Sequence, residues 1–146
     1  MKKAIVIAST IVLSACSSTY VEKGIDLNTT NGYATITTQT EKNNKIFSNL
    51  DQRLVITKHN DKSLLGLIDP YPDVLHVKEG MQSLSVQYTH LNQYANGCLW
   101  IDAKAGENYI IKREVKNYSV GFWVENTKTQ EMVGGICGSE PNRQTK

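Results

Sequence analysis

Residues 83–89 read Ser-Leu-Ser-Val-Gln-Tyr-Thr, and this stretch decides the fold class. Polar and apolar side chains alternate through it without a break, which places Leu84, Val86 and Tyr88 on one side of an extended chain. A period of two residues is typical of a β-strand with one face against a core and the other in water. We therefore expect an antiparallel sheet whose inner face includes these three residues.

Outward from this strand, the chain repeats short runs rich in β-branched and aromatic residues, separated by turn-forming residues. Further strands are expected at residues 33–38, 54–58, 64–68, 74–77, 98–103, 108–113, 118–125 and 132–137. Residues 78–80 are expected to form a hairpin turn and residues 90–97 a polar loop. About eight short strands without an amphipathic helix predict an all-β fold: an antiparallel β-sandwich (immunoglobulin/transthyretin-like) or a small barrel. The sandwich domain is expected over residues 32–137 and a flexible tail over 138–146.

The N-terminus has the parts of a secretory signal: Lys2 and Lys3, a short apolar run, and the small-residue exit Leu-Ser-Ala before Cys16. The apolar run is shorter than the roughly 20 residues that a membrane-spanning helix needs. The exit resembles the lipobox of bacterial lipoproteins, in which cleavage precedes a cysteine that carries a diacylglyceryl group. The alternative is an ordinary buried apolar segment with an incidental cysteine.

The resemblance implies a signal peptide over residues 1–15, lipid on Cys16 and a tether over residues 16–31 that holds the domain near a membrane. Ser17, where an Asp would retain an enterobacterial lipoprotein at the inner membrane, implies the outer membrane. The periplasmic face is expected rather than the cell surface.

Removing residues 1–15 from the 146 leaves 131 residues, the size of one ordinary domain. The loss of Lys2 and Lys3 leaves 14 basic and 14 acidic side chains, so the mature chain is neutral. This balance gives no electrostatic reason to expect nucleic acid as a partner.

Cys98 and Cys137 remain once Cys16 is assigned to lipid. In an oxidising compartment the two are expected to form one disulfide, the alternative being two buried thiols. Because the chain has no Cys-x-x-Cys spacing and its three histidines are scattered, we expect no metal site.

The second half of the chain carries a wider resemblance. Residues 74–80 (Val-Leu-His-Val-Lys-Glu-Gly) precede the alternating run 84–88, residues 105–109 read Ala-Gly-Glu-Asn-Tyr, and residues 124–129 form a closing turn. This order resembles the small lipoprotein β-sandwich domains of Gram-negative envelopes, including those like the PEGA module. The Pro-Glu-Gly-Ala signature is absent, so the resemblance implies a fold and a setting and no functional residues.

Catalytic patterns are missing from the sequence. His59, His76 and His90 are candidate bases, but no Gly-x-Ser-x-Gly elbow or catalytic cysteine context accompanies them. His59 and His90 are expected in solvated turns and His76 half-exposed in a strand. We therefore expect neither enzymatic activity nor a cofactor.

Two aromatic residues are candidates for binding. Tyr71 lies between two prolines, and Trp123 lies opposite the Val120–Phe122–Val124 face of its strand. For both, the alternative is packing in the core or in a turn. Trp100 would either share an exposed patch with Trp123 or cover the Cys98–Cys137 bridge.

The function expected from these features is that of a non-catalytic outer-membrane lipoprotein whose β-sandwich binds or scaffolds another envelope component, a protein or a saccharide. Two other classes remain open. One is an inhibitor or immunity lipoprotein, which would need a protruding loop at residues 90–97 or 69–73. The other is the lipoprotein of a secretion apparatus.

Overall fold

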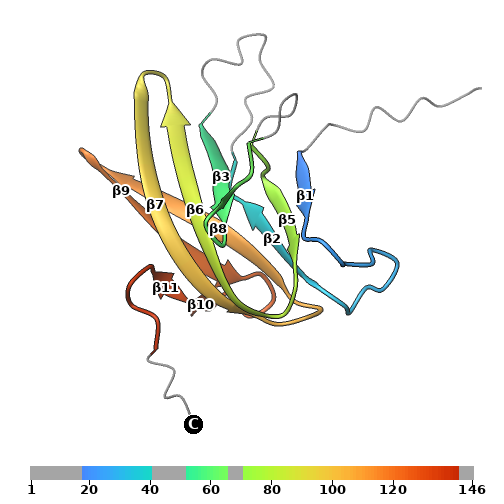
Figure 1. The fold of residues 1–146 in the computed structure, drawn as a ribbon. Helices are drawn as coiled ribbons and strands as arrows, with labels where there is room; N and C mark the ends of the chain where they lie inside the picture. The colour runs from blue at the N-terminus through green and yellow to red at the C-terminus, as the bar shows by residue number, and fades with distance from the viewer. Residues whose placement is uncertain (1–17, 41–51, 66–70, 142–146) are drawn as a thin grey trace, which may run out of the picture.

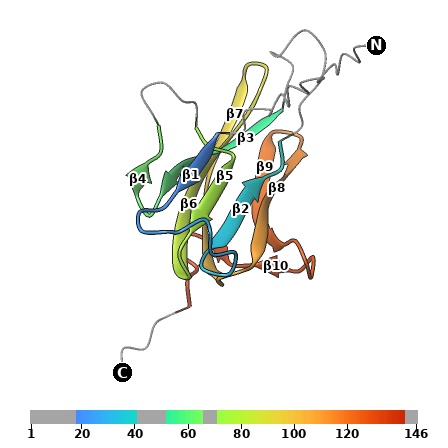
Figure 2. The same ribbon diagram turned by 90° about the vertical axis from the view of Figure 1, so that its right-hand side faces the viewer.

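A computed structural model describes residues 18–40, 52–65 and 71–141 of the chain. The fold is all-β and mostly antiparallel, with two sheets packed face to face, as the alternating pattern predicts (Figures 1 and 2). Within the described ranges, no helix has the length and apolar character required to cross a membrane.

The described residues form eleven strands, more than the sequence predicts, because several are only two or three residues long. The six-stranded sheet has the order β1 (Thr19–Val21), β5 (Val74–Val77), β2 (Ala34–Thr38), β8 (Asn108–Lys116), β9 (Ser119–Asn126), β10 (Met132–Val133). The five-stranded sheet has the order β11 (Gly135–Ile136), β7 (Gln93–Ala103), β6 (Gly80–His90), β3 (Arg53–His59), β4 (Lys62–Ser63). The pairs β1–β5 and β2–β8 are parallel, and all others are antiparallel.

The core forms where the predicted inner faces meet. Leu84, Val86 and Tyr88 of β6 are buried, as the period-two pattern predicts. From the other strands the core takes Ala34, Ile36, Leu54, Ile56, Leu75, Val77, Leu99, Ile101, Ala103, Tyr109, Ile111 and Val124. Burying one Leu or Ile side chain stabilises the fold by about 1.5–3 kcal/mol, so this cluster is the main source of stability.

The hairpin turn predicted at residues 78–80 is not formed: the turn at Lys78–Glu79 does not join two neighbouring strands of one sheet. It carries the chain from β5 in one sheet to β6 in the other, with Gly80 at a φ of +118°. Residues 104–107 make a second such corner, between β7 and β8. We call this end of the sandwich the corner end. The opposite end, which carries the tight turns β6–β7 and β8–β9, is the hairpin end.

The prediction of a polar loop at residues 90–97 is wrong. Only Leu91 and Asn92 form the turn, and Gln93–Gly97 continue β7 in antiparallel register with Val86–His90 of β6. Main-chain pairing with β6 holds this part of β7 beyond the core, so its side chains do not need to be apolar. After β3, only Asn60 and Asp61 form the turn, and the short strand β4 pairs with Lys58 and His59.

The single strand predicted over residues 132–137 is divided at Gly134, which has a φ of +70°. β10 pairs with β9, and β11 pairs with β7, so the C-terminal segment crosses from one sheet to the other. The strand expected at 64–68 is not formed at Leu64 and Leu65, and its remainder lies outside the described residues.

Both predicted flanking segments contain ordered parts. Thr19–Val21, expected within the tether, forms β1 and pairs with β5. At the other end, Ser139 of the expected flexible tail accepts a hydrogen bond at 2.9 Å from the indole nitrogen of Trp100. The tail is therefore anchored at its start.

Candidate binding surface

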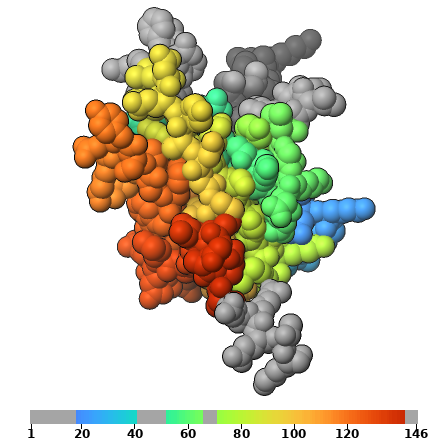
Figure 3. Space-filling model, turned by 60° about the vertical axis from the view of Figure 1, so that its left-hand side comes forward, coloured from blue at the N-terminus to red at the C-terminus, as the bar shows by residue number. Residues whose placement is uncertain are grey.

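An apolar hollow lies where the C-terminal segment crosses between the sheets. Its lining comes from Leu99, Phe122, Trp123, Val124, Met132, Val133, Gly134, Gly135 and Ile136, around a volume of about 130 Å³. Met132 and Ile136 on its rim are 70% and 65% exposed. In Figure 3 the red C-terminal segment lies beside the orange and yellow strands that precede it. We call this hollow the edge groove.

Trp123, one of the two predicted binding residues, lines the edge groove. Its indole nitrogen donates a hydrogen bond at 2.7 Å to Glu125, which forms an ion pair at 2.6 Å with Lys112. The hydrogen bonds from Lys112 and then from Trp123 lower the pKa of the Glu125 carboxyl. This chain of contacts fixes the edge of the indole and leaves the half-buried ring beside the groove.

Trp100 does not share this surface. It lies on the outer face of β7 in the five-stranded sheet, whereas Trp123 belongs to the six-stranded sheet. A β-carbon on Gly135 would lie 2.9 Å from the Trp100 indole nitrogen, so the ring packs directly against β11. The combined tryptophan patch considered from the sequence is therefore not formed.

Tyr71, the second predicted binding residue, lies apart from the edge groove. Its side chain is half-buried, and Pro72 next to it is buried, with its carbonyl accepting a hydrogen bond from the amide of Ile56. Pro70 and Asp69 lie outside the described residues, as does Cys16. Tyr71 lies near the start of β5, at the hairpin end of the sandwich.

Cys98 and Cys137 form the expected disulfide pair, with 5.3 Å between their α-carbons. The bridge joins β7 to the residue that follows β11. The amide of Cys137 also donates to the carbonyl of Cys98 at 3.0 Å. These contacts hold the C-terminal wall of the edge groove against the five-stranded sheet.

The hairpin end carries a second hollow that the sequence reasoning missed. Its volume is about 320 Å³, and it lies between the two hairpins, lined by Tyr88, Asn92, Gln93, Tyr94 and Ala95 and by Val115, Asn117, Tyr118, Ser119 and Val120. Tyr94 is 72% exposed and Tyr118 fully exposed, at 105%. One sequence feature could have indicated this hollow: residues 91–101 and 117–124, which supply most of its lining, contain no charged side chain.

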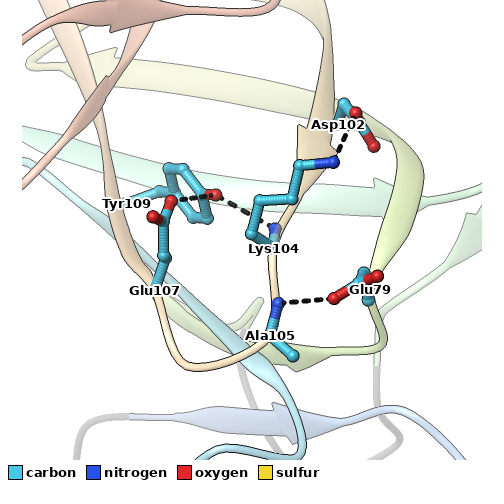
Figure 4. A network of polar contacts seen from close by, with 6 residues as sticks. All are labelled: Glu79, Asp102, Lys104, Ala105, Glu107 and Tyr109. Atoms are coloured by element: carbon cyan, nitrogen blue, oxygen red, sulfur yellow. Dashed lines mark hydrogen bonds and ion pairs between the residues drawn. The ribbon is translucent and has the colours of Figure 1, made fainter.

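The corner end of the sandwich carries polar and charged side chains. The Tyr109 hydroxyl donates to Glu107 at 2.8 Å and accepts from the Lys104 amide at 3.0 Å (Figure 4). The side-chain amide of Asn126 donates to the same Glu107 oxygen. Burial first, then the contacts with Glu107, raise the pKa of Tyr109 to about 12. These bonds fasten the β7–β8 corner to β9 and serve a structural role.

Other polar residues at this corner are also used in local contacts. Glu79 accepts a hydrogen bond from the Ala105 amide, and Asp102 forms an ion pair with Lys104 at 2.9 Å (Figure 4). Among the described residues, no group of three His, Cys, Asp or Glu side chains is placed to hold a metal ion.

Two of the histidines have structural partners. His59, expected in a solvated turn, is buried, and its Nε2 lies 2.7 Å from the Gln82 side-chain oxygen. His76 is half-buried as expected, contacts the hydroxyl of Thr35 at 3.1 Å, and burial lowers its pKa. Both have sufficient structural partners.

Comparison of the chain with protein-family models, with curated proteins and with solved structures finds no match.

Proposed function

We propose that this chain is a lipid-anchored protein of the bacterial outer membrane whose β-sandwich binds another envelope protein through the edge groove. The lipobox-like exit at Cys16 supports the anchor. The observation that carries the binding role is the groove itself, in which Trp123 lies beside the exposed side chains of Met132 and Ile136.

The apolar character of the groove favours a polypeptide partner. Methionine and isoleucine on an exposed rim, next to an indole held by Glu125, offer apolar area with little polar competition. Exposed apolar clusters of this kind mark interaction sites.

The adjacent strand edge offers main-chain hydrogen bonds. β10 pairs with β9 only at Val124 and Glu125. Among the described residues, no strand pairs with Ser119–Trp123 on the side of β9 away from β8. An extended segment of a partner can add to this edge while its apolar side chains enter the groove.

Site-specific photo-crosslinking in the native host tests this function. A photoreactive residue at position 132 is expected to give one discrete adduct with an envelope protein, and the same residue at position 28, on an exposed turn, none. Trp123→Ala should remove the adduct, because the partner loses the aromatic side chain of the groove. Tyr94→Ala removes an exposed aromatic side chain at the hairpin end, away from the groove, and should leave the adduct intact. The same adducts from positions 132 and 28 would exclude the groove as the binding site.

A further inference from the structure

We propose that the hairpin end of the sandwich lies directly on the membrane that holds the lipid of Cys16, with Leu91, Tyr94 and Tyr118 in the headgroup layer. This inference rests on the proposed lipid anchor. It replaces the long tether expected from the sequence with a short one that sets the orientation of the domain.

The first step is the length of the connection. The carbonyl of Ser18 accepts hydrogen bonds from the amides of Asp73 at 3.2 Å and Val74 at 3.4 Å, so the folded domain already includes residue 18. Only Ser17 separates it from Cys16 in the sequence. Two residue steps of extended chain span about 7 Å at most. The headgroup layer on each side of a bilayer is of similar thickness, roughly 5–8 Å. Ser18 is therefore held at the membrane surface.

The second step is the direction of the strands. β1 runs parallel to β5, β5 antiparallel to β2, β2 parallel to β8 and β8 antiparallel to β9. β1 and β9 therefore both start at the same end. β6 begins just after β5 finishes and so ends there too, at the β6–β7 turn. Figures 1 and 2 both show the start of β1 and the two hairpin turns in the upper part of the molecule, with β10 in the lower part.

The third step is the chemistry of the two ends. At the hairpin end, Leu91 is 62% exposed and lies in the β6–β7 turn, while Tyr94 and Tyr118 project from the two hairpins. Tyrosine, with an apolar ring and a polar hydroxyl, is the residue type enriched at membrane–water interfaces. Arg53 at the start of β3 can meet lipid phosphates, as can Lys116 beside the β8–β9 turn, whose ammonium forms an exposed ion pair with Glu114 at 2.9 Å.

The corner end has a surface unsuited to lipid. It carries the exposed ion pair Lys104–Asp102 and the exposed side chains of Glu79, Glu107 and Lys128. The hairpin end, with its exposed aromatic and apolar side chains, and the corner end thus lie at opposite poles, and the lipid attachment is next to the hairpin end. The edge groove lies toward the corner end, where β10 pairs with the last part of β9, and remains open to the periplasm in this orientation.

Fluorescence quenching in vesicles tests the orientation. The lipidated full-length mature protein is reconstituted in phosphatidylethanolamine and phosphatidylglycerol vesicles containing nitroxide-labelled lipid. Single cysteines placed by Leu91→Cys and Tyr118→Cys carry an environment-sensitive fluorophore, and Lys128→Cys at the corner end is the matched control. All three positions are exposed, so the changes leave the core intact.

We expect the labels at positions 91 and 118 to lose fluorescence and shift to the blue, and the label at 128 to do neither. Protein that floats with the vesicles while all three labels stay in water overturns the orientation and leaves the lipid anchor standing. Protein that does not float removes the anchor and, with it, this inference. Equal quenching at 91, 118 and 128 also contradicts a fixed orientation.

Discussion

The backbone carbonyl oxygen of Trp100 occupies the space that a β-carbon on Gly134 would need. Gly134 also has a φ of +70°, a conformation that other residues rarely adopt. Here the chain leaves the edge of β9 and reaches the edge of β7, so the closure of the edge groove depends on one glycine. The contact is with main chain, which cannot move aside as a flexible side chain would.

Replacement of Gly134 tests this closure. Gly134→Ala should lower the free energy of unfolding by about 2–4 kcal/mol, since it adds a clash to an unfavourable φ. Gly121→Ala is the matched control, because a β-carbon there meets no atom within 4 Å. Urea unfolding of both variants gives the comparison. Equal stability of the two would show that the crossing does not need glycine.

The disulfide should stabilise the same region. Cys98 and Cys137 are 39 residues apart, and closing a loop of that length stabilises a fold by about 3–4 kcal/mol in the chain-entropy model. Reduction should lower the urea midpoint by the corresponding amount. Intact mass should show the oxidised protein two hydrogens lighter than the reduced form. Alkylation of both thiols under native, non-reducing conditions would contradict the bridge.

The proposed lipid anchor has its own test. Cys16→Ser should leave an uncleaved or soluble form, because acyl burial contributes about 0.8 kcal/mol per CH₂ group and is lost. Partitioning into the detergent phase measures this. Ser17→Asp is the control: it should keep the protein lipidated and change only the membrane in which it is found. A Cys16→Ser protein that still enters the detergent phase would exclude lipid at this position.

The sequence predicts the strands that border the core and fails where main-chain pairing alone makes a strand. β6 is predictable because Leu84, Val86 and Tyr88 each need burial. The first half of β7 contains Asn96 and Gly97 and reads as a loop, yet its backbone pairs with β6 in full register. The pattern of polar and apolar side chains does not indicate such main-chain pairing.

The candidate surfaces were only partly predictable for a related reason. Alternation identified the outward side of Trp123, but the adjoining wall of the groove comes from a segment that changes sheet at Gly134. Tyr94 and Tyr118 were missed because a strand pattern gives the face of a residue and not how far its hairpin extends beyond the core. The sequence also could not predict that the strands before and after a corner turn belong to different sheets, because Lys78–Glu79 has the composition of any tight turn.

Alkaline pH should loosen the corner that Tyr109 fastens. The folded-state pKa is raised to about 12, above the ordinary value of 10, so the folded protein holds the phenol proton more tightly than the unfolded chain. The resulting stability is fully present below pH 10 and is lost as the pH rises from about 10 to 12. Urea midpoints measured across this range should fall.

Tyr109→Phe separates this contribution from that of the other tyrosines. At pH 7 the variant should lose about 1–3 kcal/mol, because the Lys104 amide and one Glu107 oxygen lose their hydroxyl partner. Above pH 10 its stability should fall less steeply than that of the wild type, since no phenol remains to ionise at this site. Tyr118→Phe, at a fully exposed position, is the matched control and should follow the wild-type curve. Parallel curves for wild type and Tyr109→Phe would show that the Tyr109 hydroxyl does not hold the corner through its proton.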